Sequence, residues 1–497
     1  MRSRRSGRLS RSLRPRPRPA SARATQRAST SRSPHRTKPF TFHVSRFTLP
    51  RLQLRKLQSL LSSLIPANPF YTRKLGSHDS ITTLDQFQRD IPFTTKQEII
   101  LDQQAHPPYG TNLTYPLEKY TRCHQTSGTT TTPIRWLDTP ESWAHFVATW
   151  RQILTAAGVQ CQDRFFFAFS FGPFLGFWSA LDAVAALGCF RFPGGAMSSI
   201  ARLQAILDNR ITILCCTPTY ALHLGEIARE QKLDLTSSCV RLIIVAGEAG
   251  GSIPATRSRI ESLWPGAFVF DHHGMTEVGP VTYQCPAQPG VLHVIESSYL
   301  PEVINPQSGA FVSSSSSFSL ARRSFSEGGS SSSKIKNQDP NSSSQTGELV
   351  LTTLDRIGSP LLRYRTGDLV RPRPRGVCAC GSHELALEGG ILGRTDDMLV
   401  VRGVNVYPSL IEEIVRSCPG IAEYRVQLDS RPSLPELIIE IEPAPGPAES
   451  SLPRHLEKAL QSSLHLRIPV RLLPQGSLPR FEMKAQRWVK VCPASSS

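Results

Sequence analysis

Apolar positions in the middle of the chain, between Trp143 and Glu248, follow two different patterns. In one pattern apolar residues recur every three or four positions, which predicts helices with one buried face. In the other, short continuous apolar runs predict strands that are buried on both faces of a sheet. The predicted helices read SWAHFVATWRQILTAAG, GFWSALDAVAALG and YALHLGEIAREQ, and the predicted strands read RFFFAFSF, ITILCCT and VRLIIVAGE. Because strands and helices alternate, the pattern favours a largely parallel sheet.

Helical spacing also begins near Leu49, in LPRLQLRKLQSLLSSLI, and the pattern changes again beyond about Asp396. There a helix entered after Pro408 precedes short strands such as ELIIEIEP and a further helix in RHLEKALQSSL. The 497 residues exceed the size at which one hydrophobic core stops growing. We therefore expect an α/β protein: a large, multi-layer N-terminal domain over 49–395 with a mostly parallel sheet, and a small C-terminal α+β domain over 396–497.

Two segments have too few large apolar residues to join a core. Residues 1–48 are rich in Arg, Ser and Pro, and residues 313–345 are rich in Ser. We expect a disordered basic tail in the first and a disordered surface insertion in the second. The insertion separates EVINPQSGAFV from TGELVLTTL, which we expect to form neighbouring strands. The tail has the composition of an organelle transit peptide, but a dispensable extension explains it at least as well.

The net charge of +18 is typical of proteins that bind nucleic acid or membranes, but its distribution argues against such a function. Nineteen basic residues precede Asp79, the first acidic residue. The rest of the chain has 38 Lys and Arg against 39 Asp and Glu. Because this nearly neutral body offers no basic binding face, we expect no nucleic-acid partner.

The longest apolar run, Phe165–Leu181, is shorter than a membrane span and is interrupted by Gly172 and Pro173, so we expect no transmembrane segment. A strand, a turn and a helix fit this run better. The eleven cysteines occur without a secretory signal, which predicts reduced thiols and a cytoplasmic protein. Cys215 and Cys216 are expected to be small buried hydrophobes.

The stretch HQTSGTTTTPIRW, from His124 to Trp136, combines several hydroxyl groups with one glycine. Such a loop can bind phosphate oxygens, but threonine-rich turns are common, so the stretch alone leaves both interpretations open. Four further motifs follow in order: HHGMTEVG (His272–Gly279), YRTGDL (Tyr364–Leu369), GRTDDMLVVRGVNVYP (Gly393–Pro408) and LPRFEMKAQR (Leu478–Arg487). From about Leu52 to Val491, this series resembles the adenylate-forming superfamily of acyl-CoA synthetases, peptide-synthetase adenylation domains and luciferases. Within that superfamily it resembles the phenylacetate–CoA ligase family.

The resemblance implies an ATP-dependent carboxylate–CoA ligase that acts on an aryl or arylacetic acid, with ATP, Mg²⁺ and coenzyme A. The acid would attack the α-phosphate of ATP to form an acyl-adenylate and release pyrophosphate. A thiolate would then form the thioester and release AMP. The resemblance also implies that the small C-terminal domain is mobile and rotates at Asp396 between the two steps.

The family's site residues can be carried over to the matching positions of this chain. The pyrophosphate would be surrounded by Ser127, Gly128, Thr129 and Thr130, and the nucleotide site would include His273 and Gly274. Thr276 would lie near the α-phosphate, Glu277 would hold Mg²⁺, and Asp368 would accept hydrogen bonds from the ribose hydroxyls. Arg394 would add charge near the ribose and phosphates, Lys484 would lie between the substrate carboxylate and the α-phosphate, and Gly403 would line the thiol channel. Taken alone, Glu277, Asp368 and Lys484 are ordinary turn or surface residues; the order of the motifs favours the functional interpretation.

The chain departs from the family pattern at several positions. Thr131 and Thr132 stand where the family loop usually has Gly-Lys, which removes one phosphate-facing charge. Met483 replaces the glycine that usually precedes the catalytic lysine, and His273 replaces a common tyrosine. We expect slower handling of pyrophosphate rather than an inactive protein.

A metal site is predicted from Cys285, His293, Cys378 and Cys380, with His383 as a spare ligand. Thiolates and a neutral imidazole suit tetrahedral Zn²⁺, and some members of the family carry a structural zinc at corresponding positions. The alternative is buried thiols with a surface histidine. We expect a closed structural site without a catalytic role.

The acyl pocket is expected between FSFGPFLGFW and VAGEAGG, with walls formed by Phe171, Phe174, Ala246 and Gly247. Apolar, aromatic walls suit an aryl or arylacetic acid, although a packed core explains the phenylalanines nearly as well.

Two other functions stay open. An adenylating enzyme could transfer the acyl group to a carrier-protein thiol or use a deazaflavin, and a non-catalytic, zinc-stabilised scaffold could bind nucleotide. The expected partners are a small carboxylic acid and CoA, with a homodimer as a candidate assembly and with neither nucleic acid nor a membrane.

Overall fold

The computed structural model describes residues 47–76, 81–126, 133–312, 345–395, 399–401, 404–429, 436–445, 451–481 and 485–491. The tail predicted over 1–48 and the insertion predicted over 313–345 lie outside these ranges, apart from Phe47, Thr48 and Gln345. Within the described ranges, no helix combines the length and the apolar character needed to cross a bilayer.

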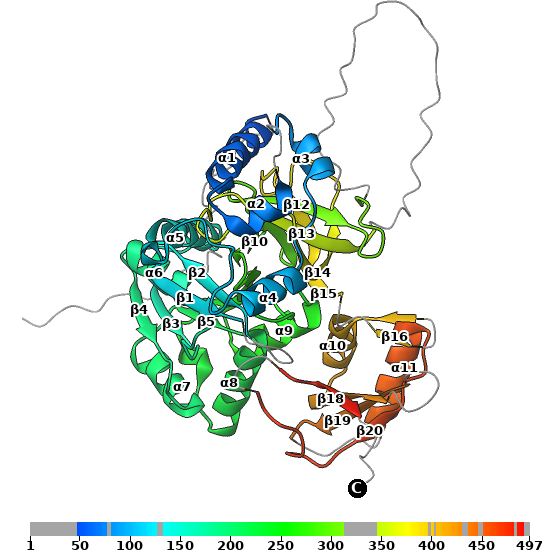
Figure 1. The fold of residues 1–497 in the computed structure, drawn as a ribbon. Helices are drawn as coiled ribbons and strands as arrows, with labels where there is room; N and C mark the ends of the chain where they lie inside the picture. Colours follow the sequence, from blue (N-terminus) through cyan, green and yellow to red (C-terminus); the bar gives the residue numbers. More distant parts are fainter. Residues whose placement is uncertain are drawn as a thin grey trace, which may run out of the picture. The chain divides into compact units, whose positions relative to one another are not determined.

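A five-stranded parallel sheet is formed by the segment with the alternating pattern (Figure 1). Its strands are β3 (Arg164–Phe167), β4 (Phe190–Pro193), β5 (Ile213–Cys216), β6 (Leu242–Val245) and β7 (Phe268–Asp271), in the spatial order β4-β3-β5-β6-β7. The accompanying helices are α5 (Pro140–Ala156), α6 (Trp178–Ala186), α7 (Ser199–Asp208), α8 (Pro218–Glu230) and α9 (Pro254–Leu263). The strands and helices predicted for this segment are confirmed.

The predicted strand RFFFAFSF is shorter in the structure, because β3 ends at Phe167. Phe167 pairs with Pro193 on one side and with Cys215 on the other, close to the ends of β4 and β5. Beyond it, Phe171 has φ 50°, a left-handed conformation that no strand accommodates. The residues that follow β3 therefore form a loop at the carboxyl edge of the sheet.

Alternate residues of the parallel strands face two different helix layers. Phe165 and Phe167 of β3 belong to a core that includes Trp150 of α5 and Ala183 of α6. Phe166 belongs to a second core with residues of α7, α8 and α9. Both faces of the sheet are thus buried, which explains why its strands are continuous apolar runs.

A second, six-stranded sheet was not foreseen as a unit. It is antiparallel and consists of β10 (Thr282–Gln284), β11 (Val291–Val294), β12 (Tyr299–Ile304), β13 (Gly347–Thr353), β14 (Tyr364–Pro372) and β15 (Ala386–Arg394), in the order β10-β11-β15-β14-β13-β12. Strands β12 and β13 are neighbours, as predicted for the pieces on either side of the serine-rich insertion. The expectation of a mostly parallel sheet therefore holds only for the first sheet.

The segment that precedes the parallel sheet consists of helices and one hairpin. The helices are α1 (Leu49–Leu64), α2 (Pro69–Leu75), α3 (Leu84–Asp90) and α4 (Lys96–Ala105), and the hairpin pairs β1 (Arg122–Gln125) with β2 (Arg135–Asp138). Short 3₁₀ helices cover Leu117–Lys119 and Leu235–Ser237. The side chains of Thr95 and Glu98 form a capping box that starts α4.

The C-terminal part has its own sheet and core. Its elements are β16 (Leu399–Val401), β17 (Val404–Val406), α10 (Pro408–Ser417), β18 (Ile421–Asp429), β19 (Glu436–Pro443), α11 (Leu452–Leu464), β20 (Val470–Leu472) and β21 (Trp488–Val491). The four-stranded sheet has the order β20-β19-β18-β21 and packs with α10 and α11. The predicted α+β unit is confirmed, whereas its predicted start at Asp396 lies outside the described residues.

A buried ionic cluster connects α10 with β18 in this unit. The carboxylate of Glu412 accepts hydrogen bonds from Arg416 Nε at 3.0 Å, from Arg487 Nη1 at 3.4 Å and from the hydroxyl of Tyr424. Burial opposes ionisation of Glu412, but the charges of Arg487 and Arg416 and the tyrosine hydrogen bond outweigh it and lower its pKa to about 2.

Glu412→Gln should therefore change how stability depends on pH. The pKa of Glu412 is about 2 in the folded chain against an ordinary value of 4.5, so the unfolded chain takes up a proton between these values that the folded chain does not. The carboxylate stabilises the fold above pH 4.5, and this contribution is lost as the pH falls towards 2. The difference in free energy of unfolding between wild type and variant should accordingly shrink over that interval in urea titrations. Glu413→Gln on the same helix is the control, and a constant difference for Glu412→Gln would contradict the prediction.

Candidate functional site

The predicted metal-binding acid lies in a tight turn. Strands β8 (Gly274–Met275) and β9 (Gly279–Pro280) form a two-stranded hairpin after β7, and its turn contains Thr276 and Glu277. Glu277 is 8% exposed, and Arg356 donates a hydrogen bond to its main-chain oxygen. The same guanidinium donates to both carboxylate oxygens of Asp138 in β2, at 2.8 and 2.9 Å. Arg356 therefore fixes the turn of Glu277 relative to the β1–β2 hairpin.

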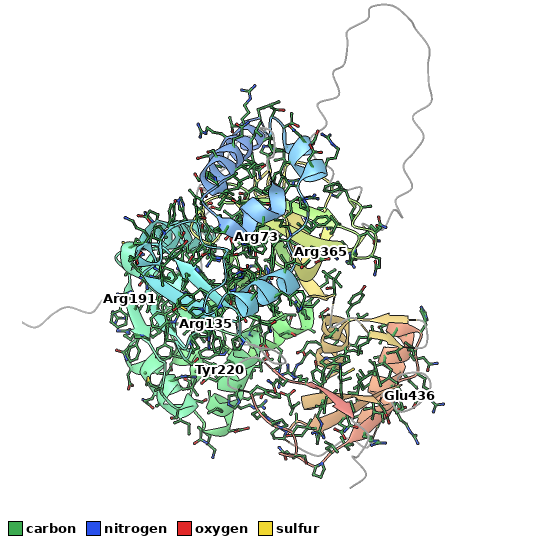
Figure 2. The ribbon with its side chains drawn as sticks, in the orientation of Figure 1. Arg73, Arg135, Arg191, Tyr220, Arg365 and Glu436 are labelled. Atoms are coloured by element: carbon green, nitrogen blue, oxygen red, sulfur yellow. The ribbon has the colours of Figure 1, made fainter. Side chains whose placement is uncertain are left out.

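The threonine-rich loop connects β1 and β2. Gln125 pairs with Arg135, and Thr126 continues the ladder through Thr126 N–H to Ile134 O at 3.0 Å and Ile134 N–H to Thr126 Oγ1 at 3.1 Å. The loop thus lies between two strands and not at a helix start. In Figure 2 the labelled Arg135 marks the start of β2.

The predicted ribose-binding acid, Asp368, lies in β14, the strand that also carries the labelled Arg365 of Figure 2. Asp368 is 4% exposed, and its Oδ1 accepts a hydrogen bond from Arg394 Nη1 at 3.2 Å. Its Oδ2 lies 3.1 Å from His273 Nε2, but the two groups are not aligned as a hydrogen bond. Among the described residues, Oδ2 therefore has no hydrogen-bond donor, although it is buried.

Arg394 is positioned by the strand pairing itself. It is the register partner of Asp368 across β14 and β15, and its Nη1 also donates to Thr366 O at 3.3 Å. Gly367, which lies between Thr366 and Asp368, has φ 77°, and a Cβ atom there would lie 2.8 Å from Arg394 Nη2. Glycine is required at this position both for the backbone conformation and for the close approach of the guanidinium.

The two adjacent histidines of HHGMTEVG have different surroundings. His272 packs against Trp150, with ring centroids 4.4 Å apart, and its Nδ1 lies 2.7 Å from Thr282 O. Burial lowers the pKa of His272 to about 3, so this ring is neutral. His273 instead faces Asp368. Its place in a nucleotide site stays a prediction.

Lys96 was missed by the sequence analysis. It occupies the first turn of α4, and its Nζ lies 3.5 Å from Glu277 Oε1. The preceding Thr94 pairs with Tyr364 of β14, and this pairing brings the start of α4 to the site. The sequence TTKQE indicates a helix start, but it contains no signal for what the lysine faces.

The predicted walls of the acyl pocket lie near the carboxyl edge of the parallel sheet. Phe171 follows β3 and packs against Trp178 with ring centroids 4.9 Å apart, and Ala246 directly follows β6. Both contact the main core from a partly buried position, together with Met275 of β8. Phe174 is partly buried and Gly247 is exposed, with φ 96°. A common cavity lined by the four residues stays a prediction.

The predicted metal ligands converge at one end of the six-stranded sheet. One ligand atom from each of Cys285, His293, Cys378 and Cys380 lies within 4.8 Å of every other. Cys285 follows β10, His293 lies in β11, and the two other cysteines occupy a turn between β14 and β15. His383 is not part of this group. His293 is 0% exposed, so the alternative with a surface histidine is wrong.

The chemistry of this cluster suits a soft divalent metal. His293 Nε2 lies 3.4 Å from Cys380 Sγ, while its Nδ1 lies 3.4 Å from the main-chain oxygen of Glu384. The hydrogen bond from Cys380, together with His293, lowers the pKa of Cys285 to about 3 against the effect of burial. A ready thiolate and an imidazole held by a backbone carbonyl are typical of zinc sites. No disulfide joins any of the ten cysteines within the described residues.

Several predicted site residues cannot be placed. The positions outside the described residues are Ser127, Gly128, Thr129, Thr130, Thr131, Thr132, Asp396, Gly403, Met483 and Lys484. Their roles stay predictions from the family resemblance.

Comparison with known proteins identifies both parts of the chain. Residues 124–299 match the family described as AMP-binding enzyme, and residues 403–490 match the AMP-binding enzyme C-terminal domain. The phenylacetate-coenzyme A ligase of Escherichia coli is 30% identical over 459 residues, covering 88% of this chain and 94% of that protein. The enzyme of the same name from Thermus thermophilus is 28% identical over 465 residues, covering 88% and 96%.

A solved structure with the same fold is that of a 2-hydroxyisobutyryl-CoA ligase. In its postadenylation state, in complex with an acyl-AMP, it superposes with a TM-score of 0.79 at 25% identity and covers 90% of each chain. In its thioesterification state, with acyl-AMP and CoA, the TM-score is 0.63 at 26% identity, covering 90% of this chain and 91% of that one. The order of the motifs along the chain and the near full-length matches agree with this similarity. The chain belongs to the phenylacetate–CoA ligase family of AMP-binding enzymes.

Proposed function

We propose that this protein is an ATP-dependent carboxylate–CoA ligase that acts on an aryl or arylacetic acid. The observation that carries the proposal is the buried carboxylate of Asp368, whose Oδ2 has no hydrogen-bond donor among the described residues. An ionised carboxylate only accepts hydrogen bonds, and an unsatisfied buried one is costly, so the site calls for a ligand with hydroxyl donors. The ribose of ATP supplies them. The names of the relatives support CoA as acceptor and phenylacetate as the model acid.

In the first half-reaction a carboxylate oxygen of the acid attacks the α-phosphorus, and pyrophosphate leaves. Asp368 would hold the ribose, and Arg394 would add positive charge beside it. Glu277 offers an oxygen ligand of the kind that Mg²⁺ prefers, and the bound ion would neutralise phosphate charge. Thr276 would lie near the α-phosphate. Lys484 would act where charge develops on the reacting carboxylate and α-phosphate.

Lys96 has a further role in this proposal. The loop between β1 and β2 lacks the lysine usual in the family, which leaves the phosphates with less positive charge. The ammonium group of Lys96, 3.5 Å from Glu277, is close enough to the predicted metal position to supply that charge. Lys96 would thus compensate for Thr132.

In the second half-reaction the thiolate of CoA attacks the acyl carbon of the adenylate, and AMP leaves. The acid is proposed to lie near Phe171, Phe174, Ala246 and Gly247, where aromatic side chains would favour a ring. The protein is proposed to work as a cytoplasmic enzyme with an N-terminal domain over 49–395 and a mobile domain over 396–497, with a homodimer as a candidate assembly.

The cysteine and histidine cluster is proposed to hold a structural Zn²⁺. Three sulfur atoms and one imidazole nitrogen complete a tetrahedral set, so no position stays open for a substrate. The ion would join β10 and β11 to the turn before β15.

Asp368→Asn should raise the KM for ATP in carboxylate-dependent ATP–pyrophosphate exchange by about 10-fold or more, because a charged acceptor of two hydroxyls is lost. The assay is run without CoA on a panel from phenylacetate and benzoates to medium-chain fatty acids, followed by thioester formation with CoA. Asp163→Asn is the matched control, since Asp163 is equally buried and pairs with Arg241 at 2.5 Å. If no acid supports exchange in the wild type, the proposed function fails.

Lys96→Ala should slow the exchange by about 10-fold, because a charge near the departing pyrophosphate is removed. Lys74→Ala is the control, because Lys74 of α2 pairs with Glu98 of α4, the helix that also carries Lys96. Equal rates for wild type and Lys96→Ala would show that Lys96 only pairs with Glu277.

The purified wild type should contain about one equivalent of zinc by elemental analysis, and Cys380→Ser should lower both the zinc content and the melting temperature. Cys161→Ser changes an exposed thiol outside the cluster and should leave both values unchanged. Less than about a tenth of an equivalent in the wild type, purified without chelators, would contradict the zinc site.

A further inference from the structure

Glu248 has no part in the nucleotide site described above, but its carboxylate connects two distant segments. It follows β6 in the sequence VAGEAGG and is partly buried. Its Oε1 accepts a hydrogen bond from Thr219 N–H in the first turn of α8, at 2.8 Å. Its Oε2 accepts one from Ala485 N–H, also at 2.8 Å. One side chain thus bridges α8 and the residue that directly follows Lys484.

The segment after Ala485 is held a second time by Arg487. This side chain is 7% exposed, and its Nη1 lies 3.4 Å from Thr219 Oγ1. Its Nε and Nη2 donate to the carboxylate of Glu423 in β18, at 2.7 and 3.1 Å. The segment after Lys484 is therefore connected to the first turn of α8 in two ways, through Glu248 and through Thr219. Tyr220, labelled in Figure 2, follows Thr219 in this turn.

These contacts belong to one particular conformer. The structure superposes on the postadenylation state of the 2-hydroxyisobutyryl-CoA ligase with a TM-score of 0.79 and on its thioesterification state with 0.63. The arrangement in which Glu248 bonds to Ala485 is thus closer to the state associated with the acyl-adenylate.

We infer that Glu248 is a positioning residue for adenylation: its carboxylate holds the chain directly after Lys484 in the conformer that forms the acyl-adenylate, and releases it before thioester formation. This inference rests on the proposed function. Glu248 need not touch ATP or the acid, because it acts through the main chain of Ala485. Its effect should therefore be confined to the half-reaction that uses Lys484.

The test compares full-length wild type with Glu248→Ala, Glu248→Gln and the control Glu261→Ala. Glu261 of α9 also accepts a hydrogen bond from a backbone N–H, that of Val269 at 3.0 Å, but within the N-terminal part. Three quantities are measured: ATP–pyrophosphate exchange with the preferred acid, single-turnover thioester formation from chemically prepared acyl-adenylate and CoA, and thermal unfolding. Hydrogen exchange is followed by mass spectrometry in a peptide that begins before Lys484 and therefore retains the backbone amide of Ala485.

In Glu248→Ala, the kcat of exchange should fall by about 10- to 100-fold, because a small misplacement of a catalytic group has effects of that size. Thioester formation from the supplied adenylate should stay within about two-fold, and the amide of Ala485 should exchange faster. Glu248→Gln keeps one acceptor oxygen for two N–H donors, so its loss should be intermediate. Glu261→Ala should change neither half-reaction.

Two results would overturn the inference. An equal loss in both half-reactions, or a lowered melting temperature that accounts for the lost exchange in both Glu248 variants, would assign Glu248 a purely structural role. Unchanged exchange in Glu248→Ala would remove any positioning role. An inactive wild type would instead overturn the proposed function, whereas an active wild type with an unaffected Glu248→Ala variant would overturn this inference alone.

Discussion

The guanidinium group of Arg356 is enclosed by three segments of the chain, and each of its nitrogens is used. Its Nε and Nη2 donate hydrogen bonds to the carboxylate of Asp138 in β2, and Nη1 donates to the main-chain oxygen of Glu277. The ring centroids of Trp136 and Phe146 each lie 5.3 Å from Arg356 Cζ. At 2% exposure this charge has no water to replace a lost partner. Removal of Asp138 or of Arg356 would leave the other charge buried and uncompensated, which costs several kcal/mol. The β1–β2 hairpin and the turn of Glu277 are therefore held in one fixed relation, and the phosphate and metal functions proposed for them depend on it.

The remaining residues of the site come from two different sheets. Ala246 and His272 directly follow β6 and β7 of the parallel sheet. They therefore lie at the carboxyl edge, where open α/β sheets bind ligands. The antiparallel sheet contributes Asp368 from β14, and His273, which follows β7, approaches this carboxylate to 3.1 Å. A ligand with separate ribose, phosphate and acyl portions suits such a junction, since each sheet presents different chemistry.

The sequence was informative wherever the signal is local or carried by a motif. Apolar runs that are buried on both faces predicted β5 and β6. The residue types and the family resemblance predicted the cluster of three cysteines and one histidine, whose ligand atoms lie within 4.8 Å of one another. Motif order also singled out Glu277 and Asp368, which are buried, and their roles stay predictions. The missed residues, Lys96, Arg356 and Glu248, act through partners far away in the chain: Arg356 contacts Asp138 across 218 positions, and Glu248 contacts Ala485 across 237. No periodicity or short motif encodes such pairs, because only the folded chain brings them together.

If the C-terminal part rotates between the two half-reactions, as proposed, the anchors of the segment after Lys484 behave differently. The bonds of Arg487 to Glu423 and Glu412 lie within that part and would travel with it. The bonds of Ala485 to Glu248, and of Arg487 to Thr219, cross to the N-terminal part and must break. A hydrogen bond to a charged acceptor contributes about 1.5–3 kcal/mol, enough to favour one conformer by about ten-fold or more without locking it. A partly exposed carboxylate is thus suited to hold a catalytic segment for one step and to exchange it for water in the next, which a fully buried ion pair could not do at comparable cost.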